Sequence, residues 1–380
     1  MSVTFKAAAI RFLQSGLIKE FDSIDSCLKH HFGIQAQMKT IPYTTIALRT
    51  KGTTVKCINN SIMNDKKIVR LWGLRNTLHY YSVDDWNLLC NFLQEKPDWF
   101  ERRMRKKGID FDQLLSAACD ILNENPIITR EIMLKNGISS EYLGPWGDLF
   151  ISLNNRGYIC NISDGKGPAC YANRSTWAPN IKHTRINYND ALCEIVVRFF
   201  SCYGPAQIHD LLHWLGYSIS NSSMNIMNTM CSQIDSLMEY EPGLWGLKNY
   251  FSLYNNIDAV AFLEDHTFIL GKFDPLLLAY NDKSWIVSDE FKKLIWRKAG
   301  HISGTVVENG LACATWDYKI KDKCLFVIIT KFKECQIEIN RVKSYFIRIA
   351  NLYECKKVEC MIMGLDNQLD GLYQMEVKSE

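Results

Sequence analysis

Apolar residues near the start of the chain recur at the three- and four-residue spacing of an α-helix. This spacing predicts a helix over residues 5–13, with one apolar face made of Phe5, Ala8, Ala9, Phe12 and Leu13. A second helix can begin at Asp22 or Ser23 and carries Ile24, Leu28 and Phe32. Its predicted end is Gly33, because glycine suits the left-handed residue that closes a helix.

Two glutamines follow this predicted helix end. Gln35 and Gln37 stand in a short stretch before Pro42, which suits the first turn of the next helix. In an extended segment, residues two apart point to the same side, whereas on a helix they diverge. The two amides can therefore act on one object. The alternative is that two polar residues after a helix simply solvate a loop, and for an isolated Gln-x-Gln this alternative is favoured.

The order helix, helix, strand is repeated along the chain and is typical of winged helices. The pattern predicts three such units at 1–109, 110–180 and 181–255, with a wing turn at Asp164-Gly165-Lys166-Gly167-Pro168 in the second. From about residue 256 the periods shorten, which favours a small β-barrel or sandwich over 256–380. The strands predicted there are 259–263, 276–280, 305–307, 311–316, 324–329 and 336–339, with a helix over 342–353. The predicted class is α+β.

The formal net charge of +3 conceals an asymmetry. Residues 1–110 hold 18 Lys and Arg against 10 Asp and Glu, so this part is +8, while the remaining residues are −5. A polyanion such as nucleic acid is attracted to the first part and repelled by the rest, which suggests a DNA partner.

The cysteines indicate the compartment. The 14 cysteines are scattered along a chain that shows no export signal and no apolar run approaching the roughly 20 residues of a membrane span. We expect free, mostly buried thiols in a reducing cytoplasm. No Cys-x-x-Cys pair is present, and we predict no metal site.

Four further motifs occur in a fixed order with the paired glutamines. They are Arg70-x-Trp72-x-x-Arg75-x-Thr77-Leu78-His79, Tyr203-Gly204-Pro205-Ala206, Trp214-x-Gly216 and Phe273-Asp274-Pro275-Leu276-Leu277-Leu278. With Gln35-Ala36-Gln37, this set resembles the winged-helix DNA-binding family of AlkZ-type (YcaQ-like) glycosylases, which release alkylated purines and unhook interstrand crosslinks. The resemblance covers nearly the whole chain.

The resemblance implies a fold, an activity and two catalytic residues. The implied fold is three tandem winged helices followed by a C-terminal β-barrel, C-shaped around DNA. The implied activity is that of a monofunctional DNA glycosylase without a metal or organic cofactor, and the catalytic roles carry onto Gln35 and Gln37. The sequence departs from the family pattern at Leu270-Gly271-Lys272, where many relatives have Leu-Pro, and at Asn76, where the family often has Gly.

Neutral amides are chemically adequate for one class of substrate. A purine alkylated at N7 is cationic and leaves as a neutral base, so its departure needs little acid catalysis. An amide carbonyl can accept a hydrogen bond from water, while its NH2 group can donate to a phosphate or sugar oxygen. A neutral glutamine is no general base, so we expect selectivity for labile, alkylated bases.

Basic residues supply candidate DNA contacts. Arg70, Arg75 and His79 could clamp phosphates, and the alternative is an ordinary helix–strand junction with a buried Trp72 and solvated arginines. Five positive charges in six residues form a second candidate, with a solvated helix end as its alternative: Arg102, Arg103, Arg105, Lys106 and Lys107. His209 and His213 have metal-compatible spacing, but we interpret them as flanking an apolar stripe.

The preferred prediction is a cytoplasmic, nucleoid-associated, monomeric enzyme acting on double-stranded DNA that contains alkylated purines, with no membrane partner. A non-catalytic winged-helix transcription regulator is the alternative. A protein-interaction scaffold that keeps the fold without the chemistry is the third possibility.

Overall fold

The computed structural model divides the chain into two units. It describes residues 2–96, 98–145, 147–163, 167–332, 335, 337–366 and 368–377. The first unit combines residues 1–35, 40–59 and 196–380, and the second combines 36–39 and 60–195. Helices α4 (Val55–Met63) and α12 (Tyr188–Tyr203) each contribute to both units. The four sequential segments proposed from the repeat pattern stay a prediction.

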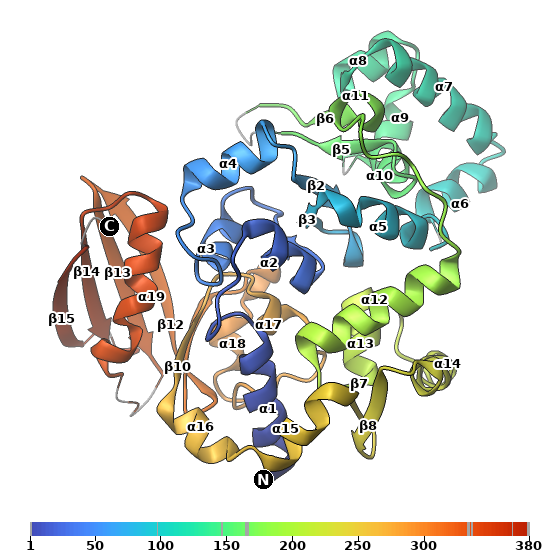
Figure 1. The fold of residues 1–380 in the computed structure, drawn as a ribbon. Helices are drawn as coiled ribbons and strands as arrows, with labels where there is room; N and C mark the ends of the chain where they lie inside the picture. Colours follow the sequence, from blue (N-terminus) through green and yellow to red (C-terminus); the bar gives the residue numbers. More distant parts are fainter. Residues whose placement is uncertain are drawn as a thin grey trace. The chain divides into compact units, whose positions relative to one another are not determined.

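The first unit begins with the helices that the apolar spacing predicted (Figure 1). Ser23 caps the second of them by accepting a hydrogen bond from Ser26 N, which satisfies a backbone donor at the helix start. The helices and short strands of this unit before residue 257 are α1 (Ser2–Gln14), α2 (Ile24–His31), β1 (Ile34–Gln35), α3 (Ile41–Ala47), β7 (Ala206–Gln207), α13 (Ile208–Leu215), α14 (Asn221–Gln233), β8 (Leu237–Glu241), β9 (Leu244–Leu247) and α15 (Phe251–Asn256).

A small sheet of order β7-β9-β8 interrupts these helices. The spacing predicts a helix that starts at Pro205, but α13 starts at Ile208. The reason is that Ala206 and Gln207 pair in antiparallel register with Trp245 and Leu244 of β9. Backbone pairing with a strand distant in sequence therefore overrides the local helical pattern.

The C-terminal part of the first unit contains a six-stranded sheet. Its order is β10-β11-β12-β13-β14-β15. The elements are α16 (Ala259–Asp265), β10 (Thr267–Leu270), α17 (Pro275–Leu278), α18 (Lys292–Ile295), β11 (Gly304–Glu308), β12 (Leu311–Lys321), β13 (Cys324–Lys331), α19 (Ile339–Leu352), β14 (Lys357–Met363) and β15 (Leu369–Glu376). Strands β13 and β14 are parallel, and α19 provides the crossover that parallel neighbours need.

This sheet corrects the predicted β-barrel. Among the described residues, the end strands β10 and β15 are not paired with each other, so the sheet is open. Two predicted strands, 259–263 and 276–280, are instead the helices α16 and α17. Asp258 and Asp274 cap them by accepting hydrogen bonds from Ala261 N and Leu276 N. Of the strand predicted over 336–339, residue 336 lies outside the described residues, and Ile339 begins α19.

Asp274 has a second role besides capping α17. Its carboxylate receives two hydrogen bonds from the Arg49 guanidinium, Nη1–Oδ2 at 2.9 Å and Nη2–Oδ1 at 2.8 Å, and both side chains are fully buried. This fork joins α17 to the end of α3. Removing either partner would leave a buried charge without compensation.

The second unit is built around a hairpin and a small sheet. Strands β2 (Ile68–Trp72) and β3 (Leu78–Ser82) are antiparallel, and β4, β6 and β5 pair in that order. The elements after β3 are α5 (Trp86–Leu93), α6 (Trp99–Lys106), α7 (Phe111–Glu124), β4 (Ile127–Thr129), α8 (Arg130–Lys135), α9 (Ser140–Leu143), α10 (Asp148–Asn155), β5 (Ile159–Asn161), β6 (Cys170–Asn173) and α11 (Arg174–Trp177). Residues 164–166 of the predicted wing turn lie outside the described residues.

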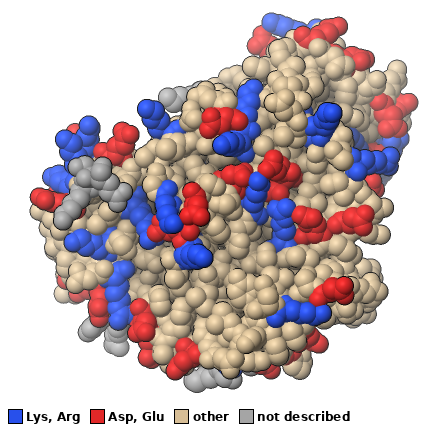
Figure 2. Space-filling model, viewed as in Figure 1, with Lys and Arg blue, Asp and Glu red and all other residues tan. Residues whose placement is uncertain are grey.

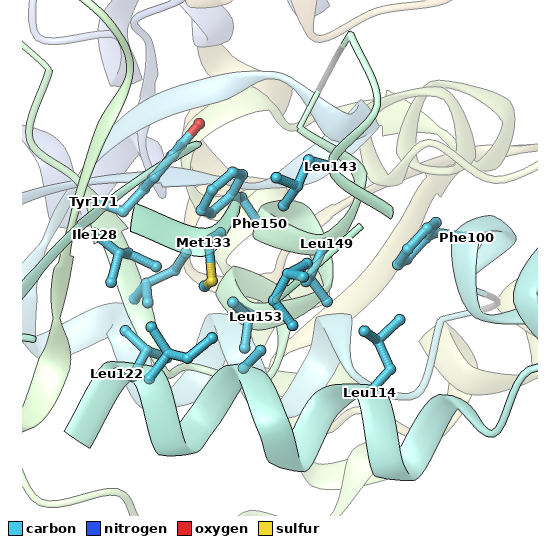
Figure 3. Close-up of a cluster of buried hydrophobic side chains, with 14 of the residues drawn as sticks. Phe100, Leu114, Leu122, Ile128, Met133, Leu143, Leu149, Phe150, Leu153 and Tyr171 are labelled. Atoms are coloured by element: carbon cyan, nitrogen blue, oxygen red, sulfur yellow. The ribbon is translucent and has the colours of Figure 1, made fainter. Parts of the chain in front are cut away.

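An apolar core closes this unit. The inner face of α7 presents Leu114 and Leu122 to Leu149 and Leu153 of α10 (Figure 3). Tyr171 of β6 covers one side, stacked on Phe150 with ring centroids 4.4 Å apart. Elements from 100 to 171 therefore share one core, which holds β5 beside the β2–β3 hairpin.

The structure also shows where the charged side chains and the cysteines lie. Figure 2 shows acidic side chains interspersed among basic ones over the visible face. All 14 cysteines are free thiols, and only Cys57 is exposed. Among the described residues, no helix combines the length and apolar composition that a membrane crossing requires.

Candidate functional site

The paired glutamines lie on an extended segment directly after α2. The helix ends at His31, and the chain reverses through Phe32 and Gly33, which both have positive φ (46° and 92°). The left-handed cap is thus Phe32, one residue before the predicted position. Ala36 is fully buried, whereas Gln35 is half-buried and Gln37 is exposed. This alternation is that of an extended chain with both glutamine side chains on the less buried side.

The backbone of residues 36–39 is held by the β2–β3 hairpin. Ala36 N donates to Leu78 O at 2.6 Å. The Arg70 guanidinium donates to the carbonyl oxygens of Ala36 and Gln37, each at 3.0 Å. The Tyr80 hydroxyl donates to Lys39 O at 3.3 Å. Four backbone groups of this short segment therefore have partners, which restrains the position from which Gln37 projects.

The two glutamine side chains differ in what they can still bind. Gln37 Oε1 accepts a hydrogen bond from Leu78 N at 3.1 Å. Because a backbone N–H can only donate, the oxygen of this amide must face the strand, and its NH2 group points elsewhere. Within the described part of the chain, neither that NH2 group nor the Gln35 amide has a hydrogen-bond partner. The segment thus offers the oriented NH2 donor of Gln37 and the side-chain amide of Gln35, whose oxygen and NH2 group are both available.

Arg70 has a different role from the phosphate clamp expected of it. Its side chain is buried, with 8% of the residue exposed, and besides the two carbonyls it donates to Asn161 Oδ1 at 3.1 Å. The guanidinium is therefore engaged inside the second unit and orients the glutamine segment. Asn161, on β5, was not identified from the sequence, where no motif marks it.

Asn154, on α10, is a second positioning residue that no sequence motif marks. Its side-chain amide pairs with the backbone of Trp72, with Trp72 N to Oδ1 at 3.1 Å and Nδ2 to Trp72 O at 2.9 Å. This pairing imitates a neighbouring strand and fixes the end of β2. Trp72 is buried in the core, as is expected if this motif is an ordinary helix–strand junction.

His79 is neutral in the folded protein. Its side chain is buried on β3, and Nδ1 lies 2.8 Å from Thr77 O. Burial, and secondly the nearby Arg75 cation, lower the pKa of His79 to about 3. The imidazole therefore carries no charge at neutral pH and cannot attract a phosphate as a cation.

Arg75 lies at the turn between β2 and β3. Arg75 and Asn76 adopt successive left-handed conformations, with φ of 57° and 54°, and Gly73 N donates to Thr77 O at 3.0 Å. Two such residues suit a tight hairpin, and asparagine tolerates this conformation well. Asn76 therefore fits where the family often has glycine. Arg75 is half-buried and keeps its expected role as a prediction.

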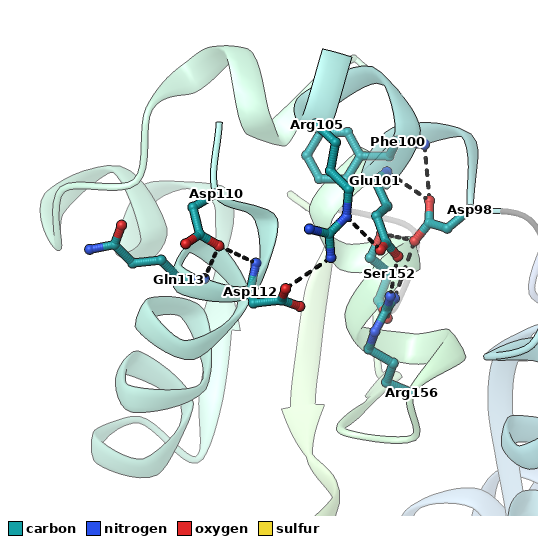
Figure 4. A network of polar contacts seen from close by, with 9 residues as sticks. All are labelled: Asp98, Phe100, Glu101, Arg105, Asp110, Asp112, Gln113, Ser152 and Arg156. Atoms are coloured by element: carbon teal, nitrogen blue, oxygen red, sulfur yellow. Dashed lines mark hydrogen bonds and ion pairs between the residues drawn. The ribbon is translucent and has the colours of Figure 1, made fainter. Parts of the chain in front are cut away.

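The basic run on α6 is largely paired with acidic side chains. Arg103 contacts the buried Asp148 at 2.7 Å, and Lys107 contacts Glu141 at 3.1 Å. Arg105 bridges Glu101 at 3.0 Å and Asp112 at 2.9 Å (Figure 4). Arg102 and Lys106 are exposed and make no ion pair within the described part of the chain. These two remain the candidates for phosphate contact.

The same network fixes the start of α6. Asp98 caps the helix through Phe100 N and Glu101 N, and its other oxygen accepts hydrogen bonds from Ser152 and Arg156 of the α10 region (Figure 4). Arg156 also bonds Glu101 at 2.6 Å. The run of positive charge is therefore partly a structural junction between α6, α7 and α10.

Among the described residues, no group of three or more His, Cys, Asp or Glu side chains is arranged to hold a metal ion. His209 of α13 lies 3.5 Å from Asp210 instead.

The fold agrees with the family comparison. A family model described as "DNA glycosylase AlkZ-like" matches residues 28–334, so the chain belongs to this family of DNA glycosylases. That span includes Gln35, Gln37 and the whole β2–β3 hairpin.

A curated sequence and a solved structure, both from Streptomyces sahachiroi, extend the comparison. A curated protein named "Interstrand DNA cross-link repair glycosylase" is 24% identical over 324 residues, covering 80% of this chain and 83% of the relative. The solved structure of the Streptomyces sahachiroi DNA glycosylase AlkZ has a TM-score of 0.78 at 19% identity, covering 94% of this chain and 99% of that one. The structural likeness shows a shared mixed α+β fold.

Proposed function

We propose that this glycosylase hydrolyses the N-glycosidic bond of N7-alkylated purines in double-stranded DNA and unhooks interstrand crosslinks formed through such bases. The observation that carries the proposal is the glutamine segment: its backbone is held by hydrogen bonds, yet the Gln37 NH2 group and the Gln35 amide have no partner among the described residues. The name of the Streptomyces relative supports crosslinked DNA as a substrate.

The two glutamines have complementary tasks in this proposal. The Gln37 NH2 group, oriented by the bond between Oε1 and Leu78 N, donates to a phosphate or sugar oxygen beside the lesion. The Gln35 carbonyl accepts a hydrogen bond from the attacking water and turns its negative end toward the developing sugar cation. Neither amide can remove a proton from water, so the reaction relies on a leaving group that is already cationic.

The wider architecture in this proposal follows the family. Three winged-helix units at 1–109, 110–180 and 181–255 would place DNA against a C-shaped surface, and a monomer would suffice. The element order α7, β4, α8, α10, β5, β6 supports the second of these units. Arg75, Arg102 and Lys106 are the proposed phosphate contacts, and none of these steps calls for a cofactor.

A cleavage assay tests the activity. Three duplexes are compared: one with a single 7-methylguanine, one crosslinked by a nitrogen mustard, and one undamaged. We expect alkali-labile abasic sites from the first two and none from the third. Gln35→Ala and Gln37→Ala should each abolish these sites, whereas Gln113→Ala, which truncates an exposed glutamine on α7, should leave them unchanged.

Two results would contradict the proposal. Comparable cleavage of undamaged DNA would refute the dependence on a cationic base. Sequence-specific protection in a footprint, with no abasic sites and with tolerance of Gln37→Ala, would indicate a transcription regulator instead.

A further inference from the structure

A cavity of about 500 Å³ lies in the second unit, away from the glutamine segment in sequence. Its walls are the C-terminal half of α7, the start of α11 and the segment 178–183. Leu122, Tyr158 and Ile181 contribute apolar surface, and Arg174, Lys182 and His183 contribute basic groups. Among the described residues, no aspartate or glutamate lines it. The lining therefore has one sign of charge.

Arg174 is the buried cation of this cavity. Only 5% of the residue is exposed, and its guanidinium lies 4.7 Å from the Trp86 ring. Its oxygen acceptors are neutral: Asn87 Oδ1 at 2.5 Å, Lys182 O at 3.2 Å and Ile181 O at 3.4 Å. Within the described part of the chain it has no carboxylate partner, and burial lowers the pKa of its guanidinium. A buried charge without an opposite charge is costly, and a bound anion would relieve that cost.

Gly157 keeps one edge of this guanidinium uncovered. Nη1 of Arg174 has only the Cys90 thiol, at 4.0 Å, as a hydrogen-bond partner among the described residues. A Cβ at Gly157 would stand 3.2 Å from Nη1, and Gly157 itself lines the cavity. The absence of a side chain at this lining residue leaves the side of Nη1 that faces Gly157 uncovered.

Helix α5 holds in place the chain segment that carries Lys182 and His183. Asn87 Nδ2 donates to Lys182 O at 2.8 Å, and Asn91 Nδ2 donates to Thr184 O at 2.8 Å. The exposed side chains of Lys182 and His183 thus project from a backbone anchored on both sides. The basic groups are positioned before any ligand arrives, which lowers the entropic cost of binding.

We propose that this cavity binds a phosphate-bearing ligand of mononucleotide size. The phosphate would contact Arg174, Lys182 and His183, because guanidinium and ammonium groups are strong donors to phosphate oxygens. The base would pack against Leu122 and the ring of Tyr158. The volume is within the range of small-ligand sites, roughly 300 to 1,000 Å³. This site lies outside the glutamine segment, and the inference does not rest on the glycosylase proposal.

Calorimetric titration of the full chain tests the proposal. The probes are guanosine 5′-monophosphate, guanosine and inorganic phosphate, at low ionic strength. We expect one nucleotide per chain, with guanosine and phosphate each bound about tenfold more weakly, since each lacks one half of the contacts. The double variant Lys182→Ala/His183→Ala should weaken nucleotide binding by about tenfold or more without unfolding the protein, because both side chains are exposed.

Controls separate this site from general basicity and from the source of the nucleotide. Lys135→Ala, on the exposed face of α8 and outside the cavity, should bind the nucleotide like the wild type. If DNA supplies the nucleotide, the monophosphate will compete with a duplex and the double variant will bind that duplex more weakly. If a free nucleotide is the ligand, duplex affinity will be unchanged. Absence of nucleotide binding at millimolar concentration, or equal binding by the double variant, would overturn the proposal.

Discussion

The glutamine segment and the basic run on α6 use charge in opposite ways. At the segment, the Arg70 cation is buried and binds backbone carbonyls, and among the described residues the Gln37 NH2 group and the Gln35 amide have no partner. On α6, three of five cations bind carboxylates, and two exposed ones remain. A count of charges along the sequence therefore overestimates how many cations are free to meet DNA, while the residues that we propose as catalytic are neutral.

The two arrangements also differ in energetic weight. Ion pairs between exposed side chains, such as that of Lys107 with Glu141, contribute at most about 1 kcal/mol. Buried hydrogen bonds of a guanidinium to carbonyls are worth more, because removing the donor leaves acceptors unsatisfied, at about 1–3 kcal/mol each. We therefore expect substitutions at the segment to have larger effects than substitutions on α6.

The largest expected effect distinguishes the two glutamines. Gln37→Glu keeps the acceptor for Leu78 N but removes the donor and adds a negative charge, so we expect glycosylase activity to fall by about a hundredfold or more. Gln35→Glu keeps an acceptor for water and should lose less than about tenfold. Single-turnover rates on a 7-methylguanine duplex measure both.

Equal losses of glycosylase activity in the two glutamate variants would contradict the proposed division of tasks between Gln35 and Gln37. They would still support a catalytic role for the segment. If neither variant lost glycosylase activity, the neutral amides would not be catalytic, and the proposed contrast with the α6 cations would be wrong. Circular dichroism of each variant confirms that the fold is retained.

The second effect concerns Arg70 as a positioning residue. Arg70→Met should reduce the free energy of unfolding by about 2–4 kcal/mol, because the carbonyls of Ala36 and Gln37 lose their donors. If Arg70 positions Gln37, kcat should fall while KM for DNA changes little. A phosphate contact would instead raise KM and reduce its salt dependence. Arg70→Lys, which can replace only part of the fork, should lie between the wild type and Arg70→Met.

The third effect is a pH dependence of stability from His79. Its pKa is about 3 in the folded state against an ordinary value of 6.5, so the folded protein resists protonation that the unfolded chain accepts. The contribution of His79 to the free energy of unfolding is therefore complete above pH 6.5 and decreases as the pH falls from 6.5 toward 3. At pH 5 the contribution of this residue should be lower by about 2 kcal/mol than at neutral pH.

Urea unfolding at pH 7 and pH 5 measures this difference, and His79→Gln should reduce it. The buried His31, whose pKa is also lowered well below its ordinary value, contributes in the same direction and remains in the variant. An unchanged difference in His79→Gln would mean that the imidazole is accessible to protons, and a phosphate contact at His79 would again be possible.

The sequence predicted the first two helices, whereas the long-range contacts could not be predicted from it. The helix start at Ser23 follows from a side chain that caps the next turn, which is a local property. The bonds from Arg70 to Ala36 and Asn161 join residues 34 and 91 positions apart, and no spacing rule encodes them. For the same reason the partners of Arg103 and Lys107, which lie 45 and 34 positions away, could not be foreseen. The Glu101–Arg105 pair, in contrast, has the four-residue spacing of neighbours on a helix.

The β module shows one limit that is local and one that is long-range. Short apolar runs at 259–263 and 276–280 fit a strand or a buried helix equally, and the capping residues Asp258 and Asp274 favoured the helices. The pairing of β13 with β14 across α19, and hence the open sheet, depends on contacts distant in sequence. The roles of Gln35 and Gln37 rested on family resemblance and stay a prediction that the segment's geometry supports.

The smallest expected effect separates paired from unpaired cations on α6. Arg102→Ala/Lys106→Ala should reduce the slope of log affinity against log salt concentration by about two, because each phosphate contact releases close to one counterion. Arg105→Ala/Lys107→Ala should change the slope by less than about one, since those cations already have acidic partners whose own charge opposes DNA. Fluorescence anisotropy of an undamaged duplex over a potassium chloride series measures both slopes. Equal slope changes would mean that the ion pairs open to bind phosphates, and the contrast with the glutamine segment would then be lost.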